Sequence, residues 1–196
     1  MLSKTFCISV SIAVLNVCFP ASLSAADELP VYGKVPDFSF TERSGNEMTL
    51  ADLKGKVWIA DFIFTRCQGM CPLMTGRMAA LEDQLAGTGI QMVSFSVDPD
   101  HDTPKVLSEY AAQHQASRHD WWFLTGRKAR MWNFITEGFS LGVAQATAED
   151  LAQGAEPVMH SNRFVLVDRE GYVRGYYDSS EPAKIEALVR DALELL

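Results

Sequence analysis

Cys67 and Cys71 are the residues whose type and spacing could do chemistry in this chain. Three residues separate them, and Pro72 follows directly. The pair stands where a strand-like apolar run gives way to a helical pattern, so a helix N-terminus is expected to face the sulfurs and to favour thiolate over thiol. Pro72 should keep both cysteines in the loop before the helix, and Gly69 gives that loop its backbone freedom. Such a loop can close around a metal ion or form a disulfide.

The distribution of the four cysteines indicates a chemical role for this pair. Cys7 and Cys18 lie in an uncharged N-terminal segment, which leaves Cys67 and Cys71 for the folded part. A disulfide framework would need more pairs, and a bridge that closes a loop of a few residues adds little stability. We therefore interpret the pair as a metal-binding or redox-active dithiol.

Two thiolates suit a soft ion such as Cu(I), whereas a structural zinc site normally takes four protein ligands. The four histidines are candidates for a third ligand. His114 and His119 lie in a polar stretch typical of a solvated helix end, and His101 lies in a loop after a strand. His160 ends the segment 138–160, which is long and has little periodicity, and such loops are often functional. From the residues alone, a solvated loop histidine is the alternative for His160.

The methionines near these residues have two possible roles. Met74 and Met78 recur at helical spacing, so core packing is their better interpretation. Met70 and Met159 stand next to the second cysteine and to the last histidine, where a thioether could assist the capture of Cu(I).

The elements that must position these residues alternate between strands and helices. Two short strands, 35–38 and 48–50, are expected around a turn at 44–46. Further strands are predicted over 57–64, 90–97, 121–124, 164–168 and 172–177. Helices are predicted from Pro72, from Thr103, over 126–138 and from Pro182. This order predicts an α/β, thioredoxin-like fold, in which helices cover both faces of a central mixed sheet that carries a short N-terminal hairpin.

Charge and length restrict the class of protein. The chain has 196 residues, 47% of them hydrophobic, and a net charge of −8. No cluster of Lys and Arg is present in the sequence, so it lacks the basic surface that nucleic acid requires and a nucleic-acid partner is not expected. Composition of this kind is typical of a globular chain with one core.

The N-terminus has the features of an export signal. Lys4 precedes an uncharged run over 5–26 that ends in small residues, so residues 1–26 are interpreted as a signal peptide cleaved before Asp27. The run is also long enough for an N-terminal membrane anchor. A lipoprotein signal at Cys18 is weaker, because Val17 precedes that cysteine. Both main alternatives place a thioredoxin-like domain, residues 27–196, in the periplasm or on another extracytoplasmic face.

Four stretches of the sequence resemble the Sco/SenC family of copper proteins in their order and spacing. They are 62–67 with 71–75, 96–99, 102–104 with 107–110, and His160-Ser161 ahead of 164–168. The resemblance runs from about residue 36 to the C-terminal helix. It implies a thioredoxin fold that binds one copper ion, as Cu(I) or Cu(II), through Cys67, Cys71 and His160.

The same resemblance implies a function and partners. Members help to assemble the dinuclear copper centre of cytochrome c oxidase, so the expected partner is a copper-accepting oxidase subunit, together with a thiol reductant or a copper donor protein. Two departures stand out. Members often carry an acidic residue between the cysteines and an aspartate before the histidine, where this chain has 68–70 without an acid and Met159. These departures remove negative charge from the two motifs.

A copper chaperone without turnover chemistry is therefore the leading hypothesis, and a thiol–disulfide reductase that uses Cys67 and Cys71 is the alternative. Thioredoxin-type reductases usually place two residues between their cysteines, where this chain has three, and their mechanism gives His160 no necessary part. A peroxiredoxin is a poorer interpretation, because Phe64 stands where the threonine of a peroxide pocket is expected.

Overall fold

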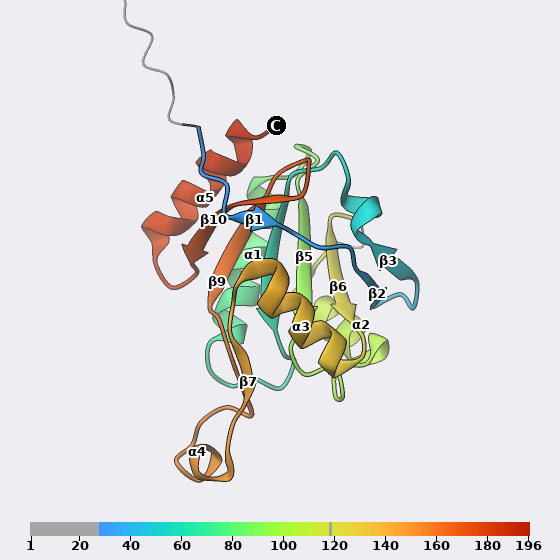
Figure 1. The fold of residues 1–196 in the computed structure, drawn as a ribbon, viewed down its shortest axis with the longest axis vertical. Helices are drawn as coiled ribbons and strands as arrows, with labels where there is room; N and C mark the ends of the chain where they lie inside the picture. Colours follow the sequence, from blue (N-terminus) through green and yellow to red (C-terminus); the bar gives the residue numbers. More distant parts are fainter. Residues whose placement is uncertain (1–27, 118) are drawn as a thin grey trace, which may run out of the picture.

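The computed structural model describes residues 28–117 and 119–196, which build a sheet of eight strands in the order β1-β10-β9-β4-β5-β6-β2-β3 (Figure 1). Its strands are β1 (Gly33–Lys34), β2 (Ser39–Glu42), β3 (Glu47–Thr49), β4 (Trp58–Ile63), β5 (Gln91–Ser96), β6 (Trp121–Thr125), β9 (Arg163–Val167) and β10 (Tyr172–Asp178). The helices are η1 (Leu50–Leu53, a 3-10 helix), α1 (Cys71–Gln84), α2 (Pro104–Gln113), α3 (Lys128–Phe139), α4 (Ala148–Ala152) and α5 (Pro182–Glu194).

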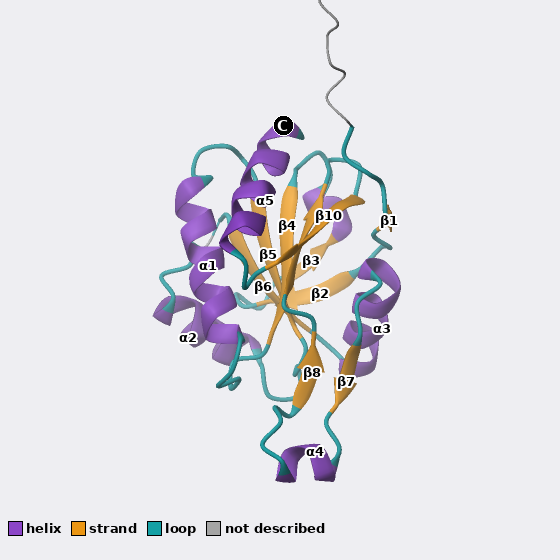
Figure 2. Cartoon of the chain, turned by 90° about the vertical axis from the view of Figure 1, so that its left-hand side faces the viewer, coloured by secondary structure: helices purple, strands orange, loops and turns teal. Residues whose placement is uncertain are grey.

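The centre of the sheet is buried on both faces. β4 runs parallel to β5, β5 runs parallel to β6, and β9 pairs with β4 in the antiparallel direction. All residues of β4, β5 and β6 are buried, as continuous apolar runs in a parallel sheet require. Helices α1, α2 and α5 lie on one side of the sheet and α3 on the other (Figure 2). The predicted thioredoxin-like α/β architecture with both faces covered is confirmed.

Several boundaries follow from local signals that the sequence shows. The side chain of Thr103 accepts a hydrogen bond from the backbone N–H of Val106, and Pro104 is the first residue of α2. Strands β9 and β10 meet at a turn where Gly171 has a positive φ of 84°. These elements lie within a few residues of their predicted ranges, because caps and glycine turns act over short stretches of chain.

The N-terminal hairpin is present, but its first strand was predicted too early. β2 pairs with β3 through Ser39 opposite Thr49, so the strand begins after 35–38. Val35 and Phe38 are buried in the core without being part of the strand. Pro36 between them lacks the N–H that a strand ladder needs, which explains the later start.

The segment 138–160 contains regular structure that its sequence did not reveal. It folds as an arm in which β7 (Val143–Gln145) and β8 (Val158–His160) pair as a two-stranded ribbon and α4 lies at the tip, away from the main sheet (Figures 1 and 2). Three paired positions are too few to produce a readable periodicity, so the prediction of an irregular loop was wrong.

Two expectations concern membranes and export. Among residues 28–117 and 119–196, no helix is both long and apolar enough to cross a bilayer. The predicted signal peptide or anchor over 1–26 lies outside the described residues.

Candidate metal centre

The loop that leads from β4 to the cysteines is fastened at its start by a buried carboxylate. Asp102 is fully buried and accepts hydrogen bonds from the Thr65 hydroxyl at 2.6 Å, from the Thr65 backbone N–H at 3.3 Å, and from the Ser96 hydroxyl at 2.6 Å. Ser96 is the last residue of β5, and β4 and β5 are parallel. The carboxyl ends of the two strands therefore meet at one edge, where Asp102 holds them together.

A second carboxylate holds the residue before the first cysteine. The Arg66 guanidinium places Nε at 2.8 Å and Nη2 at 2.7 Å from Oδ2 of Asp98, a buried residue that follows β5. Both aspartates lie in the stretches 96–99 and 102–104, and the sequence alone assigns neither of them a structural role. Their role depends on contacts that span more than 30 positions, and no local pattern shows such contacts.

The cysteines lie at the N-terminus of α1, and neither forms a disulfide. Cys67 is in the loop, but Cys71 is the first residue of the helix and Pro72 is the second, so the expectation that both cysteines precede the helix was wrong. The reason is that Met70 already has helical torsions, with φ −80° and ψ −28°. A proline within the first helical turn costs no hydrogen bond, because the N–H groups there have no partner in the helix.

Burial of Cys71 acts against the thiolate that the sequence leads us to expect. Only 1% of Cys71 is exposed, and burial raises the pKa of its thiol far above the ordinary value, with the neighbouring Cys67 and Asp61 acting in the same direction. Loss of hydration thus opposes the effect of the helix N-terminus on the thiol. A thiolate at Cys71 therefore needs a cation beside it, and a metal ion would supply one.

His160 faces the cysteines from the end of β8. Its Nε2 lies 3.4 Å from the Sγ of Cys71, and its Nδ1 lies 2.9 Å from the backbone carbonyl oxygen of Ser161. A carbonyl only accepts, so Nδ1 carries the proton and the lone pair of Nε2 points to the sulfur. The Phe64 ring meets the imidazole edge to face at 5.6 Å. Burial lowers the pKa of His160, which favours the neutral imidazole that binds metals.

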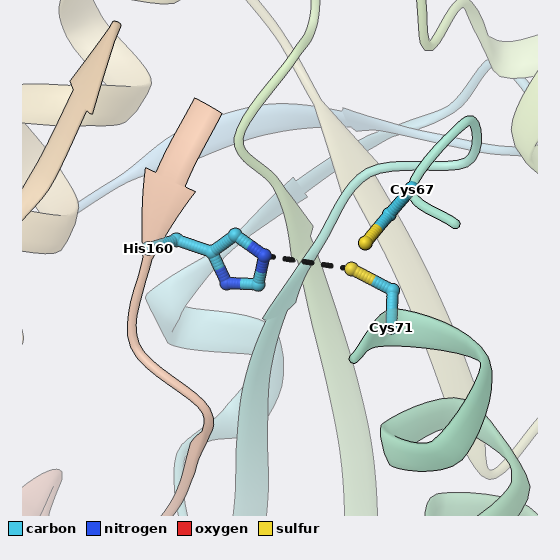
Figure 3. A group of neighbouring side chains, drawn as sticks. All are labelled: Cys67, Cys71 and His160. Atoms are coloured by element: carbon cyan, nitrogen blue, oxygen red, sulfur yellow. Dashed lines mark hydrogen bonds between the residues drawn. The ribbon is translucent and has the colours of Figure 1, made fainter. Parts of the chain in front are cut away.

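Two sulfurs and one nitrogen thus converge. The Sγ atoms of Cys67 and Cys71 and a ring nitrogen of His160 all lie within 4.8 Å of one another (Figure 3). In the part of the chain that the structure describes, this is the one group of three or more such side chains that could hold a metal ion. Thiolates and a neutral imidazole are the donors that copper accepts, and three ligands leave a site more open than structural zinc requires.

The remaining histidines lie outside this group. His101 and His119 are exposed, and His114 caps the end of α2 with its ring 4.7 Å from that of Tyr110. Met74 and Met78 are fully buried in the core, as predicted.

The two methionines beside the site are partly exposed. Met70 precedes Cys71 and is 39% exposed, and Met159 precedes His160 and is 49% exposed. Their thioethers lie in sequence beside two of the candidate ligands, and their role in copper capture stays a prediction.

The buried sheet near the cysteines contains an ionisable residue that no sequence motif marks. Asp61, in the middle of β4, is fully buried, and neither carboxylate oxygen has a hydrogen-bond partner among the described residues. Burial raises the pKa of Asp61 to about 7. Its neighbour in β5 is Ser94, whose hydroxyl accepts a hydrogen bond from Trp121 Nε1 at 2.8 Å. Asp61 stands within an apolar run that predicts a buried strand. A single aspartate does not interrupt that pattern, so the sequence does not indicate a separate role for its carboxyl group.

A carboxylate also reaches the segment between the cysteines from the arm. Glu156 Oε1 accepts a hydrogen bond from the backbone N–H of Gln68 at 3.0 Å. The sequence departures remove an acid from the cysteine motif itself, but the fold brings one to the same place from a distant segment. No motif in the sequence marks Glu156.

Fold and site together define a thioredoxin-like protein with a cluster of two cysteines and one histidine at the N-terminus of its first long helix. The SCO1/SenC family model matches residues 27–195, and the chain belongs to that family. The SCO1 protein homolog of Bacillus subtilis is 36% identical over 165 residues, which cover 83% of this chain and 82% of that protein.

Solved structures agree with this assignment. BsSco, a member of the Sco family of cytochrome c oxidase assembly proteins in which a disulfide switch was identified, matches with a TM-score of 0.71 at 33% identity, over 86% of this chain and 99% of that one. Yeast Sco1 with copper bound matches with a TM-score of 0.64 at 25% identity, over 82% of this chain and 88% of that one.

Proposed function

We propose that this protein is a copper chaperone that binds one copper ion through Cys67, Cys71 and His160 and delivers it to a copper-accepting protein. The observation that carries the proposal is the convergence of the three ligand atoms within 4.8 Å. The proposed client is a cytochrome c oxidase subunit with a dinuclear copper centre, which is supported by the family to which the chain belongs.

The three ligands have complementary parts in this proposal. The two thiolates bind Cu(I), and the imidazole adds the nitrogen that Cu(II) favours. The hydrogen bond from Nδ1 to the Ser161 carbonyl orients the ring so that Nε2 faces the ion. His160 also lines a surface hollow with Met159 and Arg163, so the ribbon that carries it lies at the protein surface.

A thiol–disulfide reductase is the second candidate. Cys67 and Cys71 are both free and their sulfurs lie within the same 4.8 Å group, so they could close a disulfide while passing two electrons and two protons to the disulfide of an acceptor protein. In that reaction His160 has no required part. The two functions therefore differ in whether the histidine matters.

We propose further that the domain works on the extracytoplasmic side, with residues 1–26 as a cleaved signal or an anchor. Intact-mass measurement of exported protein tests this directly. A species that begins near Asp27 supports cleavage, a membrane-bound species that keeps Met1 supports the anchor, and protein found only in the cytoplasm would contradict both.

Copper titration of the reduced protein tests the function. The parent should bind one copper per chain, and His160→Ala should retain part of the Cu(I) binding while losing stable Cu(II) binding. The matched control is His101→Ala, since His101 is exposed and does not belong to the ligand group. If the two variants behave alike, the reductase becomes the better interpretation.

A further inference from the structure

One side chain connects the two halves of the proposed site, which are the cysteine segment 66–71 and the arm 143–160 that carries His160. This side chain, Glu156, is not itself a ligand. Oε1 of Glu156 accepts a hydrogen bond from Gln68 N–H at 3.0 Å, across 88 positions of the chain. The same oxygen would lie 3.2 Å from a Cβ placed on Gly69. The carboxylate thus packs directly on the backbone of the first two residues between the cysteines.

Glu156 is firmly joined to the ribbon that carries His160. The next residue, Pro157, accepts hydrogen bonds on its carbonyl oxygen from Ala146 N–H at 3.0 Å and from Gln145 Nε2 at 2.8 Å. Those contacts continue the β7–β8 pairing, in which Gln145 stands opposite Val158. A displacement of Glu156 would therefore move the ribbon as well.

Few other bonds connect the two sides. Within 28–117 and 119–196, the hydrogen bonds that join 66–71 to the arm 143–160 are the one between Gln68 and Glu156 and the one between Cys71 and His160. The latter uses the two ligand atoms themselves, whose contact has to give way to an ion placed between them. With copper in place, the Glu156 bond is the polar tether left between the two halves.

We propose that Glu156 is a positioning residue of the copper site, whose carboxylate holds the backbone at Gln68 and Gly69 against the ribbon and so sets the separation between the two sulfurs and the His160 imidazole. This inference rests on the proposed copper function and deepens it. It also explains why residue 69 is a glycine. Gly69 does not have a positive φ, but any side chain at this position would press on Glu156.

Copper competition assays on the reduced mature protein test the proposal. Glu156→Ala should weaken Cu(II) affinity by about tenfold, the effect of losing one hydrogen bond to a charged group. Glu156→Gln should stay within about twofold of the parent, because the side-chain amide oxygen can accept the same N–H bond. The matched control is Glu149→Ala, an exposed acid on the same arm, which should leave the affinity unchanged.

A double-mutant cycle sharpens the test. Gly69→Ala should weaken binding like Glu156→Ala, and it should add little in the Glu156→Ala background, because both changes break the same contact. Cu(II) absorption and electron paramagnetic resonance spectra should shift in both single variants. A change in global stability alone would not alter those spectra.

The outcomes separate this inference from the proposed function. If His160→Ala lowers Cu(II) affinity but Glu156→Ala does not, the positioning role is wrong and the copper site stands. Equal losses for Glu156→Ala and Glu149→Ala, or for Glu156→Ala and Glu156→Gln, would show a charge effect and overturn the tether. Additive effects of Gly69→Ala and Glu156→Ala would overturn it too. If His160→Ala has no effect on copper, the proposed function itself fails.

Discussion

The two halves of the site are built in different ways. The cysteine half grows out of the buried sheet, where Asp102 and Asp98 fasten the loop after β4 and only 1% of Cys71 is exposed. The histidine half is a ribbon of three paired positions on an arm whose tip helix, α4, has no buried residue. The first half is held by the core and the second by a few local bonds.

This difference separates stability from binding. Removal of the Asp102 carboxylate, beside the cysteines, should lower the free energy of unfolding as well as alter the site, because Asp102 is buried and three donors would lose their acceptor. Changes on the ribbon should alter metal binding and leave the metal-free fold nearly intact.

The largest effect is expected at Asp61, beneath the cysteines. Its pKa of about 7 in the folded protein exceeds the ordinary value of 3.8, so the folded state keeps a proton that the unfolded state releases as the pH rises through this interval. The contribution of Asp61 is fully present below pH 4 and falls until about pH 7, by up to about 4 kcal/mol. In Asp61→Asn this dependence should vanish.

Urea unfolding at several pH values measures that effect. The stability of Asp61→Asn relative to the parent should rise by about 1.4 kcal/mol per pH unit between pH 4 and 7. Comparison of the two proteins at the same pH cancels the contributions of other groups that titrate. One of these is His160, whose lowered pKa acts in the opposite direction, because its contribution to stability is lost as the pH falls. Parallel curves for the two proteins would show that Asp61 is ionised in the folded state.

A somewhat smaller effect is expected at Asp102. Asp102→Ala leaves the N–H and hydroxyl of Thr65 and the hydroxyl of Ser96 without their acceptor, so we expect a loss of about 3 kcal/mol in the free energy of unfolding. Asp100→Ala is the matched control, since Asp100 is exposed and its ion pair with Lys128 is long, at 3.8 Å. Its loss should stay within about 0.5 kcal/mol. Equal losses of stability for Asp102→Ala and Asp100→Ala would contradict the claim that the buried carboxylate of Asp102 stabilises the fold more than an exposed carboxylate does.

Predictability from the sequence follows the same division. The buried runs of β4 and β5 and the Thr103 cap were predictable, because each depends on a few neighbouring residues. The ribbon was not, since three-residue strands give no period. The burial that raises the pKa of the Cys71 thiol was not predictable either, because burial depends on the whole fold.

The candidate ligands were predictable for another reason. Cys67 and Cys71 are recognisable by type and spacing alone, but His160 could be chosen among four histidines only through the family resemblance. The supporting carboxylates of Asp102 and Glu156 make contacts across 37 and 88 positions, and a single sequence does not show contacts at that range.

Among residues of the site, the smallest effect on stability is expected for His160→Ala. The imidazole is partly exposed, and its contacts are the edge of Phe64, the Ser161 carbonyl and Cys71. Its removal should change the free energy of unfolding of the metal-free protein by no more than about 1 kcal/mol. Thermal unfolding without copper measures this. A loss comparable to that of Asp102→Ala would mean that the ribbon, too, is held as part of the core.

Copper-edge X-ray absorption of the loaded, reduced protein tests the central claim most directly. The account predicts two sulfurs and one imidazole nitrogen around each copper in the parent and in His101→Ala. In His160→Ala the imidazole scattering should disappear while both sulfurs remain. A copper shell with fewer than two sulfurs in the parent, or imidazole scattering that survives in His160→Ala, would contradict the site formed by Cys67, Cys71 and His160.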